Sequence, residues 1–349
     1  DMFIRFSDQE SIDQTDSYIV KAENTAGTQR LADGSKIMGA IKGRDAIYVW
    51  SDTALFLMRF VGAPFTFSFE QVGTNCGLFG KNAAVEVDGS SYWMSENGFF
   101  TYDGQLKSMP CLVEDYVYDS INDTSRDLIN CGLNNLFGEI NWFYCSENSD
   151  KVDRVVTYNY LDSSAKQPIW TTGSLDRTAW QDSSVFNRPH ATYYTPSDND
   201  SFDVTGNTDG ITIYYNQETG TDQVNAGGVV TAIQANILSG DFDITQKRSN
   251  TGQAVGTPDL RGDGEYIMRI SRFIPDFINQ TGTTQVSFTT RAYPNSTPIT
   301  TNFPIDSTTT FKSTRIRARS IALKVSNTGS NQDWKLGTFR LDVAPGGMR

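Results

Sequence analysis

Short apolar runs that end in polar turns recur along the first two thirds of the chain. In SYWMSENGFFTYDGQ, residues 91–105, two aromatic-rich runs flank Ser-Glu-Asn-Gly, and the second run ends at Asp-Gly. Short runs rich in aromatic residues indicate strands, and Asn-Gly and Asp-Gly favour tight turns. The stretch therefore predicts a β-hairpin.

An aromatic strand that runs into a serine and an acidic residue occurs five times. Its reference positions are Phe6, Trp50, Trp93, Trp142 and Tyr193, which are 44, 43, 49 and 51 residues apart. Propeller blades repeat every 40 to 50 residues, roughly, and each blade needs its neighbours to bury both of its faces. We therefore predict a β-propeller-like repeat of hairpin blades. An irregular β-sandwich with evenly spaced hairpins is the alternative.

The pattern of strands divides the chain into two domains, 1–224 and 225–349. The chain opens directly in the strand-like MFIRF, so we expect that the propeller is incomplete at its N-terminus. After residue 225 the repeat fades, and strand-like runs such as TTQVSFTTRAY and WKLGTFRLDV alternate with Gly, Asn, Pro and Thr clusters. This second pattern predicts a β-sandwich. The predicted fold class is mainly β.

One segment near 111–130 departs from the strand pattern. Val113, Tyr116, Val117 and Ile121 have helical spacing, and Asp123 or Thr124 is a candidate cap for a further turn of helix. A short helical insertion is expected in the third unit.

Composition limits the classes of function. The 349 residues include 41 acidic and 29 basic side chains, for a formal charge of −12. Such a chain does not attract nucleic acid or an anionic membrane as a whole. No apolar run approaches the roughly 20 residues of a membrane helix, so no membrane-spanning segment is expected.

The residues that usually hold metals or perform catalysis are few. Cys76, Cys111, Cys131 and Cys145 are far apart among apolar neighbours, and His190 is the only histidine. We interpret the cysteines as buried free thiols, with disulfides or a metal as alternatives. The sequence predicts no catalytic residue, no metal site and no cofactor. We therefore expect that the protein is not an enzyme.

A glycosidase is the enzymatic alternative. SENGFFT resembles the Asp-box turn of sialidase-like propellers, with Asn97 in place of the aspartate. That turn is structural, and the arginines, tyrosine and acid that such an enzyme needs have no readable spacing here.

An arginine pattern marks a candidate interface in the second domain. Arg315, Arg317 and Arg319 share one face of a strand by alternation, and the same parity continues as Ile321, Leu323 and Val325. This predicts a strand face that changes from basic to apolar. It either docks on an acidic partner or is a solvated strand end with local ion pairs.

Several long phrases resemble the tail hub or nozzle proteins of short-tailed phages, which include tail tubular protein B and the packaged-DNA stabilisation proteins. These phrases are IRFSDQESIDQ, AIYVWSDTALFLMRFVGAPFTFSFEQVG, NAAVEVDGSSYWMSENGFFTYDGQLKSMPC, RARSIALKVSN and WKLGTFRLDVAPGGMR. The resemblance runs from Ile4 to Arg349.

The resemblance implies a structural virion component that is assembled in the host cytoplasm. It implies a homo-oligomeric ring, six-fold in most members, beneath the portal and adaptor proteins, which surrounds the channel for viral DNA and docks tail fibres or spikes. A receptor-binding tail adhesin is the alternative from another class.

The acidic hairpin loop that holds Asp198, Asp200, Asp203 and Asp209 gains a candidate role from that channel. Its residues do not match a calcium loop, because Asp203 and Asp209 replace the required Gly and Glu. A lumen that holds few phosphates would let DNA pass without specific binding. We therefore place this loop at the lumen or its rim, with the solvated exterior as the alternative.

Overall fold

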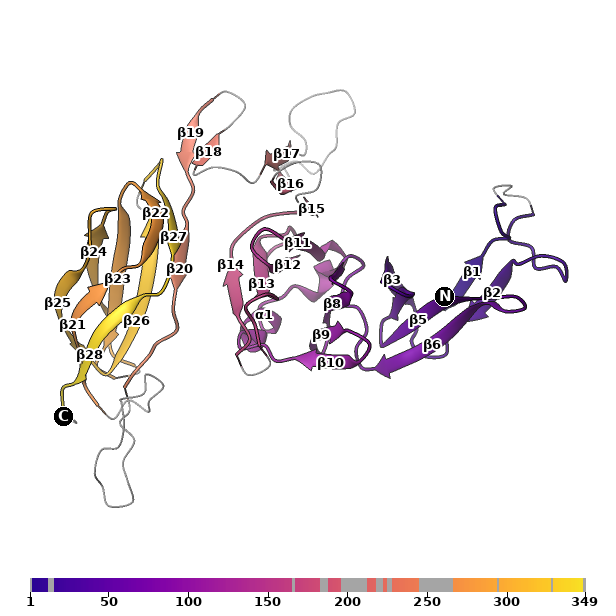
Figure 1. Ribbon diagram of the computed structural model, residues 1–349, viewed down its shortest axis with the longest axis horizontal. Helices are drawn as coiled ribbons and strands as arrows, with labels where there is room; N and C mark the ends of the chain where they lie inside the picture. The colour runs from indigo at the N-terminus through magenta and orange to yellow at the C-terminus, as the bar shows by residue number, and fades with distance from the viewer. Residues whose placement is uncertain are drawn as a thin grey trace, which may run out of the picture. The chain divides into compact units, whose positions relative to one another are not determined.

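The protein is mainly β and forms two compact units, Asp1–Thr219 and Gly220–Arg349 (Figure 1). The computed structural model describes residues 2–11, 16–164, 167–182, 188–195, 212–217, 222–224, 228–244, 266–293, 295–327 and 329–347. The units divide a few residues before the predicted boundary after residue 224.

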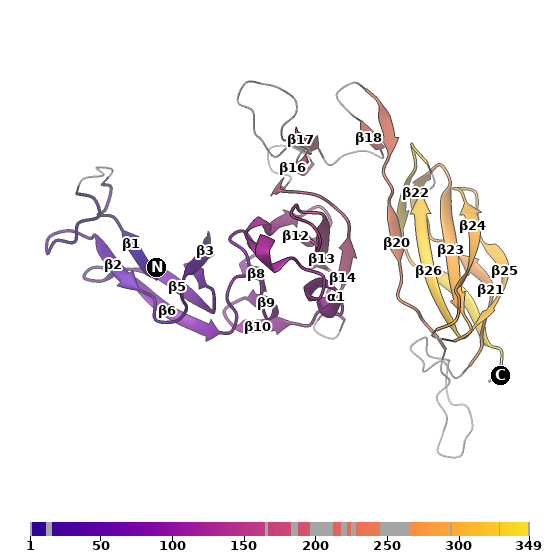
Figure 2. The same cartoon turned by 180° about the vertical axis from the view of Figure 1, so that it is seen from behind.

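The first unit contains three successive four-stranded antiparallel sheets and a three-stranded one (Figures 1 and 2). In each sheet the strands pair in chain order, as in a propeller blade. The first blade has β3 (Ile37–Lys42), β4 (Ile47–Ser51), β5 (Ala54–Gly62) and β6 (Thr66–Thr74). The second has β7 (Ala84–Val87), β8 (Ser90–Ser95), β9 (Gly98–Tyr102) and β10 (Leu106–Met109). The third has β11 (Asn130–Asn134), β12 (Glu139–Tyr144), β13 (Arg154–Asn159) and β14 (Trp170–Gly173), and the fourth has β15 (Ala179–Gln181), β16 (His190–Thr195) and β17 (Thr212–Gln217).

The prediction of a repeated hairpin is confirmed. Trp50, Trp93, Trp142 and Tyr193 all lie on the second strand of their sheets. Phe6 is different, because it belongs to the two-stranded sheet of β1 (Phe3–Phe6) and β2 (Gly27–Arg30), whose apolar residues pack on the first blade. Among the described strands, no pairing closes the blades into a ring.

Aromatic rings join consecutive blades into one core. The ring centroids of Trp50 and Trp93 are 5.3 Å apart, and those of Phe99 and Trp142 are 5.0 Å apart. The Nε1–H of Trp93 donates to the carbonyl of Cys76 at 2.8 Å, and that of Trp142 to the carbonyl of Ala83 at 2.9 Å. Each acceptor precedes the tryptophan's own sheet in the chain. The indoles therefore supply apolar area and also satisfy a main-chain group between blades.

The first strands of consecutive blades lie next to one another, β3 beside β7, β7 beside β11, and β11 beside β15. Glycine permits this approach at two positions. A Cβ atom on Gly39 would lie 2.7 Å from the carbonyl oxygen of Lys81, and one on Gly132 would lie 2.5 Å from Cγ of Trp180. Neither distance leaves room for a side chain, so these glycines set the spacing of the inner strands.

The serines of the repeated motif brace turns. The buried Ser51 Oγ accepts hydrogen bonds from the amides of Thr53 and Ala54, at 3.2 and 2.9 Å. In the third blade, the amide and Oγ of Ser146 both donate to Asp153, at 2.8 and 2.7 Å. The repeated motif is therefore a structural one.

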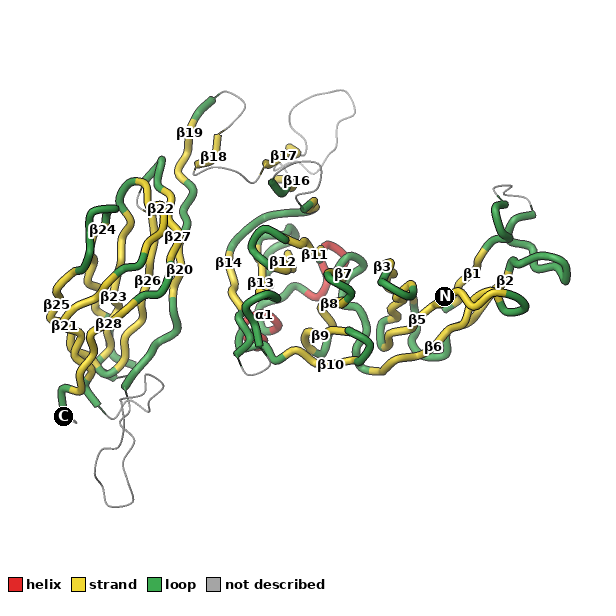
Figure 3. The backbone as a smooth tube through the Cα atoms, viewed as in Figure 1, coloured by secondary structure: helices red, strands yellow, loops and turns green. Residues whose placement is uncertain are grey.

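The insertion between the second and third blades holds α1 (Glu114–Tyr118) and the 3-10 helix η1 (Asp123–Leu128), the helices of the described part (Figure 3). The predicted cap at Asp123 or Thr124 was wrong by a residue. The side chain of Asn122 accepts a hydrogen bond from the amide of Thr124 and so occupies the cap position. Asn is a preferred cap because its short side chain reaches the free amides of the first turn.

The second unit is a β-sandwich, as the sequence predicted. One sheet has the order β20 (Asn236–Leu238), β26 (Ser320–Asn327), β23 (Thr284–Arg291) and β24 (Ile299–Ile305). The other has the order β25 (Lys312–Ala318), β21 (Met268–Ile274) and β28 (Arg340–Pro345). Phe273 and Phe288, one from each sheet, are buried with centroids 5.3 Å apart in the shared core. Two-stranded sheets of β18 (Asp222–Val224) with β19 (Val230–Ala232), and of β22 (Phe277–Thr281) with β27 (Asp333–Leu336), complete the unit.

Replacement of Gly132 by alanine should destabilise the first unit by about 1–3 kcal/mol, because the added carbon overlaps the indole of Trp180. Gly173→Ala is the matched control in the same sheet, since its Cβ would meet only Val155 Cγ1 at 3.5 Å. Urea unfolding followed by tryptophan fluorescence measures both variants. Equal midpoints for the two would contradict this account of the blade spacing.

Candidate interface on the C-terminal sandwich

Arg315 and Arg317 lie on β25 and are exposed, whereas Ile316 and Ala318 between and after them face the core. The expectation that one strand face changes from basic to apolar is corrected. The chain leaves one sheet after Ala318 and enters the other sheet at Ser320. The residues of one parity therefore face outward in β25 and inward in β26, where Ile321 and Val325 are buried. The crossing between sheets reverses which parity faces the core.

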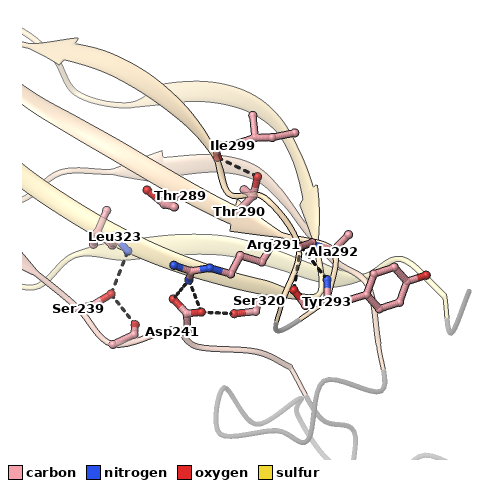
Figure 4. Close-up of polar contacts among 12 residues, drawn as sticks. Ser239, Asp241, Thr289, Thr290, Arg291, Ala292, Tyr293, Ile299, Ser320 and Leu323 are labelled. Carbon is pink, nitrogen blue, oxygen red and sulfur yellow. Dashed lines mark hydrogen bonds and ion pairs between the residues drawn. The ribbon is translucent and has the colours of Figure 1, made fainter.

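Arg319 occupies the crossing itself. Its amide donates to the carbonyl of Arg291 at 3.2 Å, and its guanidinium lies over the ring of Tyr293, 5.8 Å from the centroid. Arg291 is ion-paired with Asp241, whose carboxylate also accepts a hydrogen bond from Ser320 Oγ at 2.9 Å (Figure 4). This network joins the segment after β20 to the ends of β23 and β26. The structure therefore separates Arg319 from the other two predicted arginines.

A groove of about 570 Å³ lies beside Arg315 and Arg317. It is formed by the edge strands β24 and β25, which lie on the same side of the sandwich in both views (Figures 1 and 2). Its lining combines hydroxyl and guanidinium groups with apolar surface: Thr290, Thr301, Phe303, Ser313, Thr314, Arg315, Ile316 and Arg317. Its chemistry suits a polar or anionic partner.

The register of the three-stranded sheet shows that the basic surface is wider than one strand. Arg269 on β21 is directly opposite Arg317, and Arg272 and Arg340 project from the same outer side of the sheet. We call this surface the arginine face: Arg269, Arg272, Arg315, Arg317 and Arg340. Sequence reasoning missed three of these residues. The signals were present as arginines in the alternating runs MRISRF and FRLDV.

The arginines of this face differ in their local partners. Arg272 Nε lies 2.6 Å from Asp342 Oδ2, and its guanidinium lies 5.6 Å from the ring centroid of Phe311. Arg317 Nη2 reaches the carbonyl of Gly346 at 3.5 Å. Arg269, Arg315 and Arg340 form no ion pair with any residue that the structure describes. Their charges are available to a partner.

The first unit offers two weaker candidates. A groove of about 400 Å³ lies between the β3–β4 and β7–β8 turns, lined by Lys42, Gly43, Arg44, Glu86, Asp88 and Gly89. The β5–β6 hairpin ends in an apolar tip where Phe60 and Phe65 are 73% and 77% exposed. The run FVGAPF was the sequence signal for this tip.

The predicted lumen or rim residues Asp198, Asp200, Asp203 and Asp209 lie outside the described residues. Within the described part of the chain, no group of three or more His, Cys, Asp or Glu side chains is arranged to hold a metal ion. In that same part, no helix is both long enough and apolar enough to span a membrane.

Neither a protein-family model nor a curated protein sequence matches the chain. Among solved structures, it aligns with a glycoside hydrolase at a TM-score of 0.25 and 10% identity, over 85% of this chain and 83% of that one. It also aligns with an exo-β-1,3-galactanase from Phanerochaete chrysosporium bound to galactose, at a TM-score of 0.25 and 10% identity, over 85% and 78% of the two chains.

The expectation that the protein is not an enzyme is corrected by this finding, because the aligned structures are glycoside hydrolases. A likeness at a TM-score of 0.25 assigns no reaction and no catalytic residue to this chain. The resemblance to phage tail proteins stays a prediction.

The cysteines are free thiols, with Cys76 and Cys145 buried and Cys111 and Cys131 partly buried. Burial raises the pKa of Cys76 and of Cys145 to about 11, and that of Cys111 to about 12. Burial also raises the pKa of Cys131.

These thiols should react slowly with Ellman's reagent at pH 8 in the folded protein, because burial raises the pKa of each and so suppresses the reactive thiolate. Unfolding in urea should release all four to rapid reaction. The absorbance of the released chromophore measures both rates. Rapid reaction of four thiols in the folded protein would contradict the assigned burial.

Proposed function

We propose that the protein is a structural component of a phage virion, one subunit of a ring in the tail nozzle or hub. The proposal is carried by one observation: strands with a resemblance to tail hub proteins are also strands that join the blades. Two of the aromatic phrases that resemble tail hub proteins contain β4 and β8, whose tryptophans pack together between the first and second blades. A subunit built in this way is a scaffold that stacks small sheets and presents their turns at the ends.

The second unit supplies a docking surface in this proposal. The arginine face and the adjoining groove lie on a sandwich that is attached to the blades by the chain itself. Such a surface suits contact with a neighbouring subunit or with another tail component, including portal, adaptor, fibre or spike proteins. Arginine is favoured at such interfaces because its planar fork binds carboxylates bidentately.

The charge of the first unit suits a channel that DNA crosses without being held. Residues 1–219 carry 31 acidic and 15 basic side chains, a formal charge of −16. Each phosphate held by a basic side chain would add salt-sensitive affinity and slow the release of DNA. In the assembled ring, acidic and neutral side chains would therefore face the axis.

Negative-stain imaging of the purified full chain tests the proposal. We expect hollow, tapered rings with cyclic symmetry, because ring subunits associate through two different surfaces. Elongated trimeric fibres would instead favour the adhesin. Hydrolysis of a member of a polysaccharide panel by the same preparation, together with monomeric particles, would favour the glycosidase and overturn the proposal.

The full chain should also leave duplex DNA unshifted in a gel mobility assay at low ionic strength, where any phosphate contact is strongest. The same mixture at about pH 4 is the internal comparison, because partial protonation of Asp and Glu then makes the net charge of the protein positive. Retardation of the duplex at neutral pH would contradict passage without binding.

A further inference from the structure

Five basic side chains of the second unit share one outer sheet surface. Residues 220–349 carry 14 basic and 10 acidic side chains, a formal charge of +4 against −16 for the preceding residues. Five of those basic side chains form the arginine face, and Asp342 is the acidic side chain that projects among them. The two units of one chain therefore have opposite charge.

The arginine face is unfavourable for folding. Arg269 and Arg317 are directly opposite on neighbouring strands. Both side chains are on the outer surface, because the residues before and after each of them face the core. Like charges in such positions repel and destabilise a sheet. Since Asp342 pairs with Arg272, it does not offset this repulsion. A local arrangement that opposes folding is expected where a surface binds a partner.

A complementary acidic surface exists at one end of the second and third blades. Hydrogen bonds to main-chain carbonyls hold its three segments together. The amide of Glu147 in the β12–β13 loop donates to the carbonyl of Ser120 at 2.7 Å, and Tyr118 Oη donates to the carbonyl of Ser95 at 2.6 Å. We call this surface the acidic end, and its exposed carboxylates are Glu96, Asp115, Asp119, Asp123, Glu147 and Asp150.

The acidic end is as little compensated as the arginine face. None of its six carboxylates forms an ion pair with a described residue. Glu114 lies among them, and its pKa is raised by burial and by the negative charge of Asp115. The exposed side chains of Leu112 and Tyr116 add apolar area beside the carboxylates. Charge and apolar area together are typical of a protein interface.

We propose that the arginine face binds the acidic end of a second copy of this chain. This inference rests on the proposed function, because it names the partner of the docking surface. The two surfaces are different, so the contact is heterologous and propagates from copy to copy until it closes a ring. Arginine forks on one copy pair with carboxylates on the next, and the cross-strand repulsion between Arg269 and Arg317 is relieved.

A polyanion such as DNA is the less favoured occupant. The whole chain carries a charge of −12, which repels an approaching duplex at low ionic strength. A second copy of the chain supplies one acidic end for each arginine face. The carboxylates of that end form no ion pair with a described residue.

The test uses two charge-reversal variants of the full chain. Arg269→Glu with Arg340→Glu reverses the arginine face, and Asp119→Lys with Asp123→Lys reverses the acidic end. Arg269→Glu should not impair folding, because it replaces a cross-strand repulsion by an attraction to Arg317. Lys335→Glu on β27 is the matched control, an exposed reversal on a different sheet of the same unit.

Sedimentation velocity at about 0.05 M salt measures association. We expect that the apparent dissociation constant of each double variant alone rises by at least about tenfold, and that the dissociation constant of the control is unchanged. An equimolar mixture of the two double variants should recover association, since each presents one unaltered surface to the other. Association of the parent chain should weaken by about tenfold or more at 0.5 M salt.

Three outcomes would overturn the inference. Unchanged association of both double variants would show that other surfaces join the copies, and ring particles from those variants would leave the proposed function intact. Failure of the mixture to recover would exclude pairing of these two surfaces. Binding of a duplex oligonucleotide by the parent chain, lost in the arginine variant, would assign the face to a polyanion. Recovery in the mixture, together with parent-chain assemblies that are not rings, would instead contradict only the proposed function.

Discussion

The first unit depends on the contact between the faces of consecutive blades. A four-stranded sheet of short strands has too little apolar area to be stable alone, so its tryptophans and phenylalanines must be buried against the next sheet. Trp93 and Trp142 do this and also donate to main-chain carbonyls outside their own sheets. The hydrogen bond fixes the orientation of each indole, and the indole then fixes the separation of the sheets.

That separation determines which residues are possible at the inner strands. Gly39 and Gly132 face atoms closer than any side chain would allow, so the blades approach through main chain there. The turns at the blade ends have no such restriction. They differ in length and in charge, and one of them has been extended into the helical insertion with its exposed carboxylates. A rigid interior thus leaves the ends available for contacts with other molecules.

The candidate interface shows the same division between local and distant determinants. Alternation alone placed Arg315 and Arg317 outward on a strand, and both are exposed. It placed Arg319 with them incorrectly, because the chain passes from one sheet of the sandwich to the other at that residue. Arg269 and Arg340 joined the face through pairing with strands more than forty residues away in the chain. No short-range pattern contains that register.

The sequence by itself determined the elements that depend on neighbours in the chain. The spacing of Trp50, Trp93 and Trp142 predicted repeated hairpins, since turn chemistry and alternation act over a few residues. It also predicted the sandwich and the insertion, although it placed the cap of η1 beyond Asn122. Only the tertiary structure decided which sheet each strand joins and which charges meet across strands. Those outcomes depend on burial of apolar faces against partners distant in sequence, and the free energy of that burial is set by the whole fold.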